Sequence, residues 1–240
     1  MDLSFREFSE NIIQSGDIDP DYILIREKCE ELGWDKKQMF NWILHKLVIY
    51  DSYSELEVIL KRKNIFDVKY GTERRKSKRF AQDYLNNIQR AFIFTDVEKF
   101  FSRDGNVVFN QIKTIKGFGS WASWKFMDLM SCCYGLDVDF NGIDFREAYT
   151  FPLKGLLMIH GYPEDVRLLK DTKLYNKLIT STHDMLSGLE DLKAPHNNNK
   201  GLRIQEVETL LCKYHSYKHN KYKPGQDLIH LAKRGKECII

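Results

Sequence analysis

The sequence predicts a mostly α-helical protein, and three observations lead to that fold class. Apolar residues recur every three or four positions in many segments of the 240-residue chain, as they do on one face of an α-helix. Residues that favour helix starts and stops, such as Pro20 and Gly33, stand at the ends of these segments. Convincing runs of alternating apolar and polar residues, which are typical of half-buried strands, are missing from the sequence.

The first half of the chain contains several segments of helical character. Asp19-Pro20-Asp21 is typical of a helix start, and Gly33 is the expected stop of that helix. After a break at Tyr70-Gly71, a long helix with a basic N-terminal half is expected. The helices expected in this half cover residues 19–32, 36–50, 52–61, 74–94, 96–101 and 107–114.

The second half continues the helical pattern, with one interruption. Residues 193–201 have no apolar periodicity, so a linker or mobile loop is expected there. Residues 217–225 form a basic and aromatic segment, which is followed by a short tail. The helices expected in this half cover residues 119–134, 145–159, 163–170, 173–187 and 204–216.

Composition limits the classes of protein that the chain can belong to. An apolar fraction of 42% allows a real core, and 240 residues suffice for one large domain or two small ones. A net charge of +3 excludes a highly basic packaging protein, yet it allows DNA binding. Five cysteines without a CxxC pair indicate neither a disulfide framework nor a structural zinc site. No signal peptide is recognisable and no apolar run approaches the ~20 residues of a membrane span, so a soluble, intracellular protein is expected.

Residues 115–122 fit the hairpin of a helix-hairpin-helix at about residues 107–134, because Gly117 and Gly119 stand two positions apart between two expected helices. Glycines at such a turn permit positive φ and leave backbone N–H groups accessible. With Ser120 at the start of the next helix, these groups can hold a DNA phosphate without reading sequence. An ordinary tight turn is the alternative, and the residues that follow favour DNA binding.

The segment after the hairpin resembles the helix-hairpin-helix DNA glycosylase superfamily. A helix, Gly135 and a short apolar stretch lead to Val138-Asp139, and Asp139 follows Gly119 by 20 residues. The resemblance implies a glycosylase-like fold with two helical lobes around a cleft, formed by residues 1–240 as one catalytic unit. Asp139 would be its catalytic carboxylate. Trp121 occupies the position of the lyase lysine, and Phe140-Asn141 departs from the usual motif, so lyase chemistry and ordinary base excision are both disfavoured.

Two blocks of sequence resemble a narrower group, the phage-associated amino acid:DNA transferases, also described as α-glutamyl/putrescinyl thymine pyrophosphorylases. Residues 208–214 resemble the group's C-terminal E-x-x-L-C-x-Y/K box, and weaker agreement runs through residues 42–50 and 71–75. The first block follows the group's pattern GFGxWxAFKxxDL, glycine, VDF at Gly117, Phe118, Gly119, Trp121, Lys125, Asp128, Leu129, Gly135, Val138, Asp139 and Phe140.

This resemblance implies an unusual reaction in the cytoplasm of an infected bacterium. The substrate would be double-stranded phage DNA in which 5-hydroxymethyluracil carries a pyrophosphate in place of thymine. A small amine would displace the pyrophosphate and leave a C–N bond on a hypermodified thymine. Glycine, serine, glutamate and putrescine all remain possible amines.

The chemistry of that reaction indicates which residues could perform it. The amine must lose a proton to attack, so a carboxylate base is expected: Asp139 first and Glu208 second. Asp139 could instead stabilise cationic character. Cations are expected around the leaving pyrophosphate. The candidates are Lys125, Lys213 and Lys218, or Arg74 and Arg75, and the two arginines are also candidates for DNA contact. The base must leave the stack, and its expected pocket comprises Trp121, Trp124, Cys212, Lys213, Tyr214, Tyr217 and Lys218.

Several alternatives remain open from the sequence. Glu208, Cys212, His215 and His219 share one helical face, which suits a metal or a Cys–His nucleophile but more often means a buried cysteine and a solvated edge. No metal site is therefore predicted and no cofactor is required, although a divalent metal could assist. Lys125 and Asp128 could form an exposed salt bridge. A monofunctional DNA glycosylase and a non-catalytic DNA-binding module are the competing functions.

Overall fold

The computed structural model describes residues 3–71, 77–140, 142–147 and 150–237. Within these ranges the chain is mostly helical and has no strand, apart from an isolated antiparallel bridge between Ala194 and Lys200. The mostly α fold class is thus confirmed. Contacts divide the chain into two compact units: unit 1 is Met1–Pro20 with Asp144–Leu231, and unit 2 is Asp21–Ile143 with Ala232–Ile240. No helix in the described ranges is long and apolar enough to cross a membrane.

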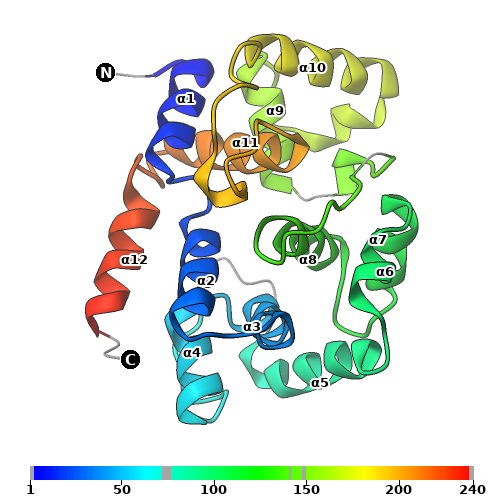
Figure 1. The fold of residues 1–240 in the computed structure, drawn as a ribbon. Coiled ribbons are helices and arrows are strands. Elements are labelled where there is room, and N and C mark those ends of the chain that lie inside the picture. The colour runs from blue at the N-terminus through cyan, green and yellow to red at the C-terminus, as the bar shows by residue number, and fades with distance from the viewer. Residues whose placement is uncertain (1–2, 72–76, 141, 148–149, 238–240) are drawn as a thin grey trace. The chain divides into compact units, whose positions relative to one another are not determined.

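Unit 2 is built around helix α8, which is buried at every position from Trp121 to Cys132. Helices α3 and α7 pack against α8, and α4 and α5 pack against α3 (Figure 1). An aromatic cluster fills the core, where the Phe126 ring lies 5.3 Å from Phe92 and 5.1 Å from Phe101. The helices of this unit are α2 (Pro20–Glu31), α3 (Lys36–Ile49), α4 (Ser52–Lys61), α5 (Ala81–Phe92), α6 (Val97–Phe101), α7 (Gly105–Lys113) and α8 (Ser120–Cys132).

Unit 1 is centred on the packing of α9 against α11 (Figure 1). A Cβ on Gly155 would lie 2.3 Å from the carbonyl oxygen of Leu211, so glycine allows the two helix backbones to approach closely. Leu156 and Leu210 are fully buried beside this contact. The helices of this unit are α1 (Phe5–Ser15), α9 (Thr150–Ile159), α10 (Thr172–Met185), α11 (Ile204–Lys218) and α12 (Gln226–Glu237), of which α12 extends past the boundary at Leu231.

Local capping explains why most expected helices in unit 2 form where the sequence places them. The side chains of Asp35 and Asp51 accept hydrogen bonds from backbone N–H groups in the first turns of α3 and α4. Gly33 has φ +62°, as expected of a glycine that ends a helix. The expected helices at residues 19–32, 36–50 and 52–61 are therefore confirmed to within a residue or two at each end.

Three helices are shorter than expected. Of the helix expected at residues 74–94, the part that the structure describes, from residue 77 onward, contains α5, preceded by the short 3-10 helix Lys78–Phe80. The helix expected at residues 145–159 corresponds to the 3-10 helix Phe145–Glu147 and to α9, which begins at Thr150, while residues 148–149 lie outside the described part of the chain. Residues 163–170 give only a 3-10 helix, Val166–Lys170, because the Asp165 side chain accepts the Arg167 backbone N–H at 3.1 Å and so sets a later start.

Residues 193–201, where a linker or mobile loop is expected, form an irregular loop within unit 1 and do not link the two units. Ala194, His196 and Asn197 are each 1% exposed, so the segment is packed into unit 1. His196 Nε2 lies 3.2 Å from Glu206 Oε1, and Asn197 Nδ2 donates to the same oxygen at 3.1 Å. The lack of apolar periodicity correctly indicates an irregular segment. That segment is held in place by buried polar contacts.

Unit 2 also contains a buried network of charged side chains. Lys46 and Glu55 are fully buried, and Lys46 Nζ lies 2.9 Å from Asp21 and 4.0 Å from Glu55. Trp42 Nε1 donates to Glu55 Oε2 at 2.8 Å. Burial raises the pKa of Glu55 to about 8 and outweighs the opposing charge of Lys46. The network thus couples the stability of unit 2 to pH.

Candidate DNA-modification site

A turn over residues 114–119, called the hairpin below, connects α7 to α8 at the position where the sequence predicts a helix-hairpin-helix. Gly117 has φ +90°, which only glycine adopts readily, whereas Gly119 is extended at φ −106°. The expectation of positive φ therefore holds for the first glycine and fails for the second. Between them, Phe118 is 4% exposed and its N–H donates to the Ile115 carbonyl at 2.9 Å, which anchors the turn in unit 2.

Helix α5 supports the hairpin from one side. Asn87 donates a hydrogen bond to the Lys116 carbonyl at 3.1 Å. The Tyr84 ring lies so close to Gly117 that an added Cβ would be 2.3 Å from Cδ1 of the ring. The conformation of the hairpin thus depends on α5 as well as on its own glycines.

The hairpin exposes its backbone to solvent. Gly117 and Gly119 are both exposed, and no atom lies within 4 Å of a Cβ built on Gly119. Gly119 is the N-cap of α8 and provides no side-chain hydrogen bond to the first turn, so an anion can approach that helix end. Lys116 is exposed as well, and the sequence analysis did not select this residue as a DNA contact.

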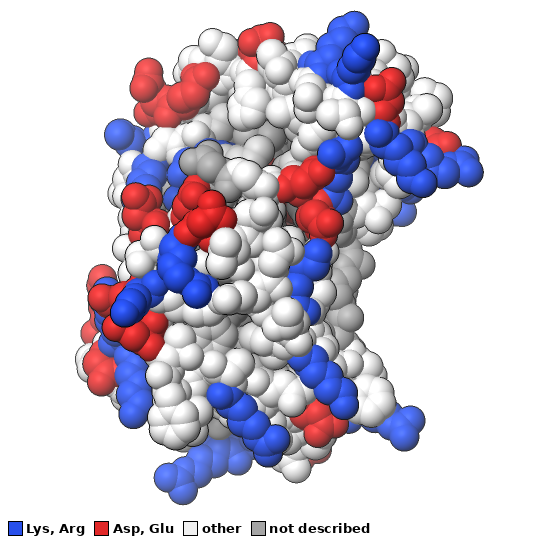
Figure 2. All heavy atoms as spheres, turned by 90° about the vertical axis from the view of Figure 1, so that its right-hand side faces the viewer, with Lys and Arg blue, Asp and Glu red and all other residues white. Residues whose placement is uncertain are grey.

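Positive charge is dispersed on the face that Figure 2 shows. Lysine and arginine side chains alternate with aspartate, glutamate and uncharged residues, without one continuous basic patch among the described residues of this face. Such a surface favours local phosphate contacts over a broad electrostatic footprint. Arg74 and Arg75, the predicted basic contacts, lie outside the described residues.

Asp139 lies between two buried neighbours in unit 2. Val138 is 7% exposed and Phe140 is 9% exposed, while Asp139 itself is half-buried. Its Oδ2 accepts the N–H of Gly105 at 3.4 Å, at the N-terminus of α7. A Cβ on Gly105 would lie 1.9 Å from the Asp139 carbonyl oxygen, so glycine is needed for this approach. Gly105 is therefore a positioning residue that sequence reasoning missed.

The two predicted tryptophans of the base pocket lie in different environments on α8. Trp124 is 1% exposed and its ring packs edge-on against Phe140 at 5.1 Å. Trp121 is 9% exposed and lies 5.4 Å from the Tyr50 ring. In this structure Trp124 supports the segment that carries Asp139 and has no face open for a base to stack on.

Lys125 and Asp128 form the expected pair, but the pair is buried and not exposed. Their side chains are 7% and 3% exposed, and Nζ lies 3.4 Å from Asp128 Oδ2. Tyr22 closes the site by donating to the same oxygen at 2.7 Å, and Lys125 Nζ lies 5.9 Å from its ring. Tyr22 stands 106 residues before Asp128 in sequence, so the i,i+3 spacing of Lys125 and Asp128 could not indicate its contribution.

The C-terminal box lies on α11 in unit 1. Glu208 is 2% exposed, and the neighbouring Thr209 hydroxyl donates to Asp19 at 3.2 Å. Lys213 donates to the Asp17 carbonyl at 2.7 Å and forms an ion pair with Asp227. Although burial lowers the pKa of Lys213, the surrounding carboxylates raise it further, so this lysine stays charged.

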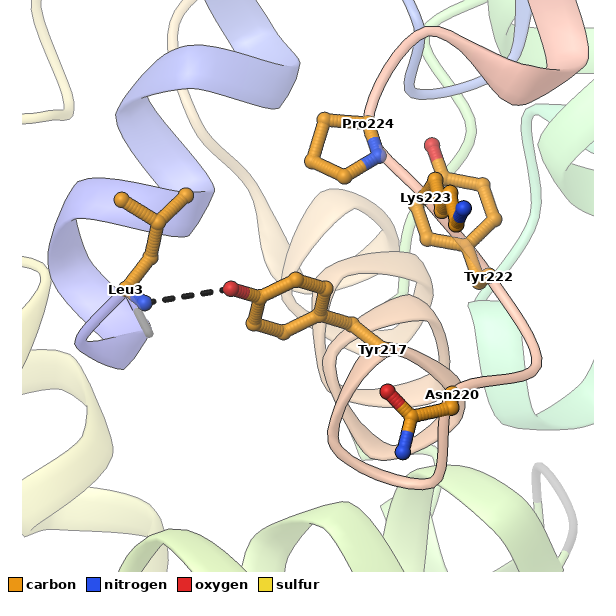
Figure 3. Close-up of a pocket in the computed structure, with 6 residues that line it drawn as sticks. All are labelled: Leu3, Tyr217, Asn220, Tyr222, Lys223 and Pro224. Atoms are coloured by element: carbon orange, nitrogen blue, oxygen red, sulfur yellow. Dashed lines mark hydrogen bonds between the residues drawn. The ribbon is translucent and has the colours of Figure 1, made fainter. Parts of the chain in front are cut away.

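The aromatic residues of the box pack toward the N-terminal segment. Tyr214 is 6% exposed, its hydroxyl donates to the Leu3 carbonyl at 3.1 Å, and Lys218 Nζ lies 5.5 Å from its ring. The Tyr217 hydroxyl accepts the Leu3 N–H at 3.1 Å. Figure 3 shows Tyr217 in a cavity of about 390 Å³ whose other lining residues are Leu3, Asn220, Tyr222, Lys223 and Pro224.

The predicted site residues thus fall into two groups. The hairpin, Trp121, Trp124, Lys125 and Asp139 belong to unit 2. Glu208 and the predicted pocket residues of the box belong to unit 1, namely Cys212, Lys213, Tyr214, Tyr217 and Lys218. In unit 2 these residues lie on α8 and on the segments directly before and after it. In unit 1 they lie on α11.

Comparison with known protein families identifies the family of the chain. One family profile matches residues 50–222, which is more than half of the 240-residue chain and includes parts of both units. The match places the protein among the transferases that modify DNA. The chain belongs to the amino acid:DNA transferase family. Its substrates are accordingly DNA and an amino acid or amine.

Proposed function

We propose that the protein replaces the pyrophosphate of 5-pyrophosphoryloxymethyl-uracil in phage DNA with an amine, which gives a hypermodified thymine. The observation that carries the proposal is the family match over residues 50–222, which names an amino acid and DNA as the two partners of the transfer. The resemblance of residues 117–140 and 208–214 to the phage-associated members supplies the finer chemistry.

The reaction exchanges one bond at the 5-methylene carbon. The nitrogen lone pair of the amine forms the new C–N bond. The C–O bond breaks, and pyrophosphate leaves with the electron pair of the C–O bond. The amine proton passes to a carboxylate, for which Asp139 is the first candidate. In support, Asp139 is half-buried between two buried residues and is held by Gly105, so it has a fixed position and access to solvent.

The hairpin is proposed to hold the DNA backbone while the base is modified. Exposed glycines, an α8 N-terminus without a side-chain cap, and the exposed Lys116 together suit a phosphate. Lys125 is buried and paired with Asp128, so its proposed role is to fix α8 beneath the site and not to touch pyrophosphate.

Unit 1 is proposed to contribute the box on α11 to substrate binding. Tyr217 lines a cavity that also contains Lys223, a combination that suits a small ligand with an anionic group. Glu208 remains the second candidate base, although its 2% exposure requires a local rearrangement before an amine can reach it. Divalent metal could assist the departure of pyrophosphate.

Nucleoside mass spectrometry tests this function. Purified protein is incubated with DNA that carries pyrophosphorylated 5-hydroxymethyluracil and, in separate reactions, glycine, serine, glutamate or putrescine. The expected result is a base whose mass has changed by exchange of pyrophosphate for one of these amines. Free base and abasic sites would instead indicate a glycosylase, and unchanged DNA with every amine would overturn the proposal.

A further inference from the structure

Two histidines and a glutamate of unit 1 meet at the C-terminal end of α11. His215 and His219 stand one helical turn apart, so both imidazoles project from the same face. Glu164, in the loop that follows α9, reaches both: Oε2 lies 2.8 Å from His215 Nε2 and Oε1 lies 2.7 Å from His219 Nε2. The helical spacing groups these histidines with Glu208, whereas in the structure the carboxylate beside them is that of Glu164.

The environment of the cluster differs from that of an ordinary surface ion pair. The His215 side chain is 5% exposed, and its Nδ1 is buried without a hydrogen-bond partner among the described residues. The Phe151 ring lies 5.5 Å from the His215 ring, with its plane tilted by 54°. His215 is therefore held with Nε2 as its polar contact, directed at Glu164.

The chemistry of the three side chains suits a metal. Two imidazole nitrogens and one carboxylate oxygen form a donor set that Zn²⁺ and other first-row ions prefer to Mg²⁺ or Ca²⁺.

We infer that Glu164, His215 and His219 bind one divalent transition-metal ion of the Zn²⁺ type. The three ligand atoms lie within 4.8 Å of one another. Around a tetrahedral Zn²⁺ with bonds of about 2.0–2.2 Å, ligand atoms stand roughly 3.3–3.5 Å apart. The separations of the ligand atoms therefore exceed those of a tetrahedral site by about 1.5 Å at most. Small rotations of the partly exposed side chains of Glu164 and His219 remove that difference.

One coordination position or more remains for water or a substrate group. Three protein ligands are typical of zinc sites that keep an open position, whereas structural sites use four. The open side faces solvent, because His219 is 42% exposed and Glu164 is 29% exposed. This site is independent of the proposed transfer reaction, and metal binding can be measured without it.

Metal binding is tested on tag-free protein that has been stripped with a chelator and then dialysed against Zn²⁺ or Co²⁺. The readouts are metal content by mass spectrometry, Zn²⁺ affinity by calorimetry and the visible absorption of bound Co²⁺. The variants are Glu164→Gln, which keeps the size of the side chain but replaces one acceptor oxygen with an NH2 group, and His219→Ala, which changes a partly exposed residue. His230→Ala, an exposed histidine elsewhere in unit 1, is the matched control.

The expected result is about one Zn²⁺ per chain, with affinity lowered at least about tenfold in both cluster variants and unchanged in the control. Co²⁺ absorption of the intensity typical of tetrahedral coordination should disappear in the same two variants. Sub-stoichiometric metal, or equal affinity in all four proteins, would overturn the inference and leave a hydrogen-bonded His–Glu–His cluster. Circular dichroism of each variant confirms that a loss of binding is not a loss of fold.

Discussion

The two hairpin glycines should respond differently to the addition of one methyl group. In Gly117→Ala, a residue with φ +90° must accept a left-handed conformation, at a cost of roughly 1–2 kcal/mol. The new Cβ would also lie 2.3 Å from the Tyr84 ring, and relieving that contact costs about 1–3 kcal/mol. A total near 3 kcal/mol corresponds to a fall in Tm of roughly 6–12 °C for a chain of this size.

Gly119→Ala is the matched control for stability and the test for DNA binding. Gly119 has φ −106° and nothing within 4 Å of its Cβ, so stability should change by less than about 0.5 kcal/mol. The methyl group nevertheless occupies the exposed backbone where a phosphate is expected. Loss of one charge-assisted hydrogen bond, about 1.5–3 kcal/mol, should weaken duplex binding by about tenfold or more.

Differential scanning fluorimetry measures the first effect and fluorescence anisotropy with a DNA duplex measures the second. In a Tyr84→Ala background the contact with the ring is absent. Adding Gly117→Ala to that background should therefore lower stability, relative to Tyr84→Ala, only by the backbone cost. Unchanged Tm in Gly117→Ala would refute the conformational reasoning. Wild-type DNA affinity in a folded Gly119→Ala protein would refute the hairpin as the phosphate contact.

Three further outcomes are expected. The pKa of Glu55 is about 8 in the folded protein and near 4.5 in the unfolded chain. Its contribution to the free energy of unfolding is therefore complete below pH 4.5 and is lost as pH rises through 8. In Glu55→Gln, the free energy of unfolding from urea curves should no longer fall with pH between these values, where the slope is at most about 1.4 kcal/mol per pH unit. Gly155→Ala should destabilise unit 1 by about 1–3 kcal/mol through contact with the Leu211 carbonyl, measured by urea denaturation; wild-type stability would contradict the close approach. Lys116→Gln should reduce the slope of log affinity against log salt by about 0.9, and an unchanged slope would exclude this lysine as a phosphate contact.

The sequence predicted those helices whose ends are capped locally. Asp35 and Asp51 stand directly before α3 and α4 and cap them from within a few residues. The hairpin was predictable for the same reason, because Gly117 carries the turn in its own backbone conformation. Local chemistry suffices where the interactions that define an element lie within one turn of it.

Helix α12 was expected as a short tail, since its cap comes from the other end of the chain. Asp17 is fully buried and accepts the N–H groups of Gly225, at 2.6 Å, and Leu228, at 3.0 Å, at the beginning of α12. No window of neighbouring residues contains this interaction. Helix α1, by contrast, has a capping box between Ser4 and Glu7 that the sequence displays, and it was overlooked.

The candidate site shows the same division between local and distant information. The resemblance to DNA glycosylases singled out Asp139 after the hairpin, and the i,i+3 spacing paired Lys125 with Asp128. Tyr22, which buries the pair of Lys125 and Asp128, comes from a distant segment of the sequence. The same is true of Glu164, which contacts His215. Their roles became visible only through tertiary packing.

Pyrophosphate release measured together with base mass tests the transfer reaction most directly. The protein, its Asp139→Asn variant and the control Asp137→Asn, an exposed carboxylate two residues away, are each incubated with pyrophosphorylated DNA and the active amine. We expect one pyrophosphate for each modified base, loss of most turnover in Asp139→Asn and normal turnover in Asp137→Asn. Modified base without pyrophosphate, or full activity in Asp139→Asn, would contradict the proposed exchange or the role of Asp139 in it.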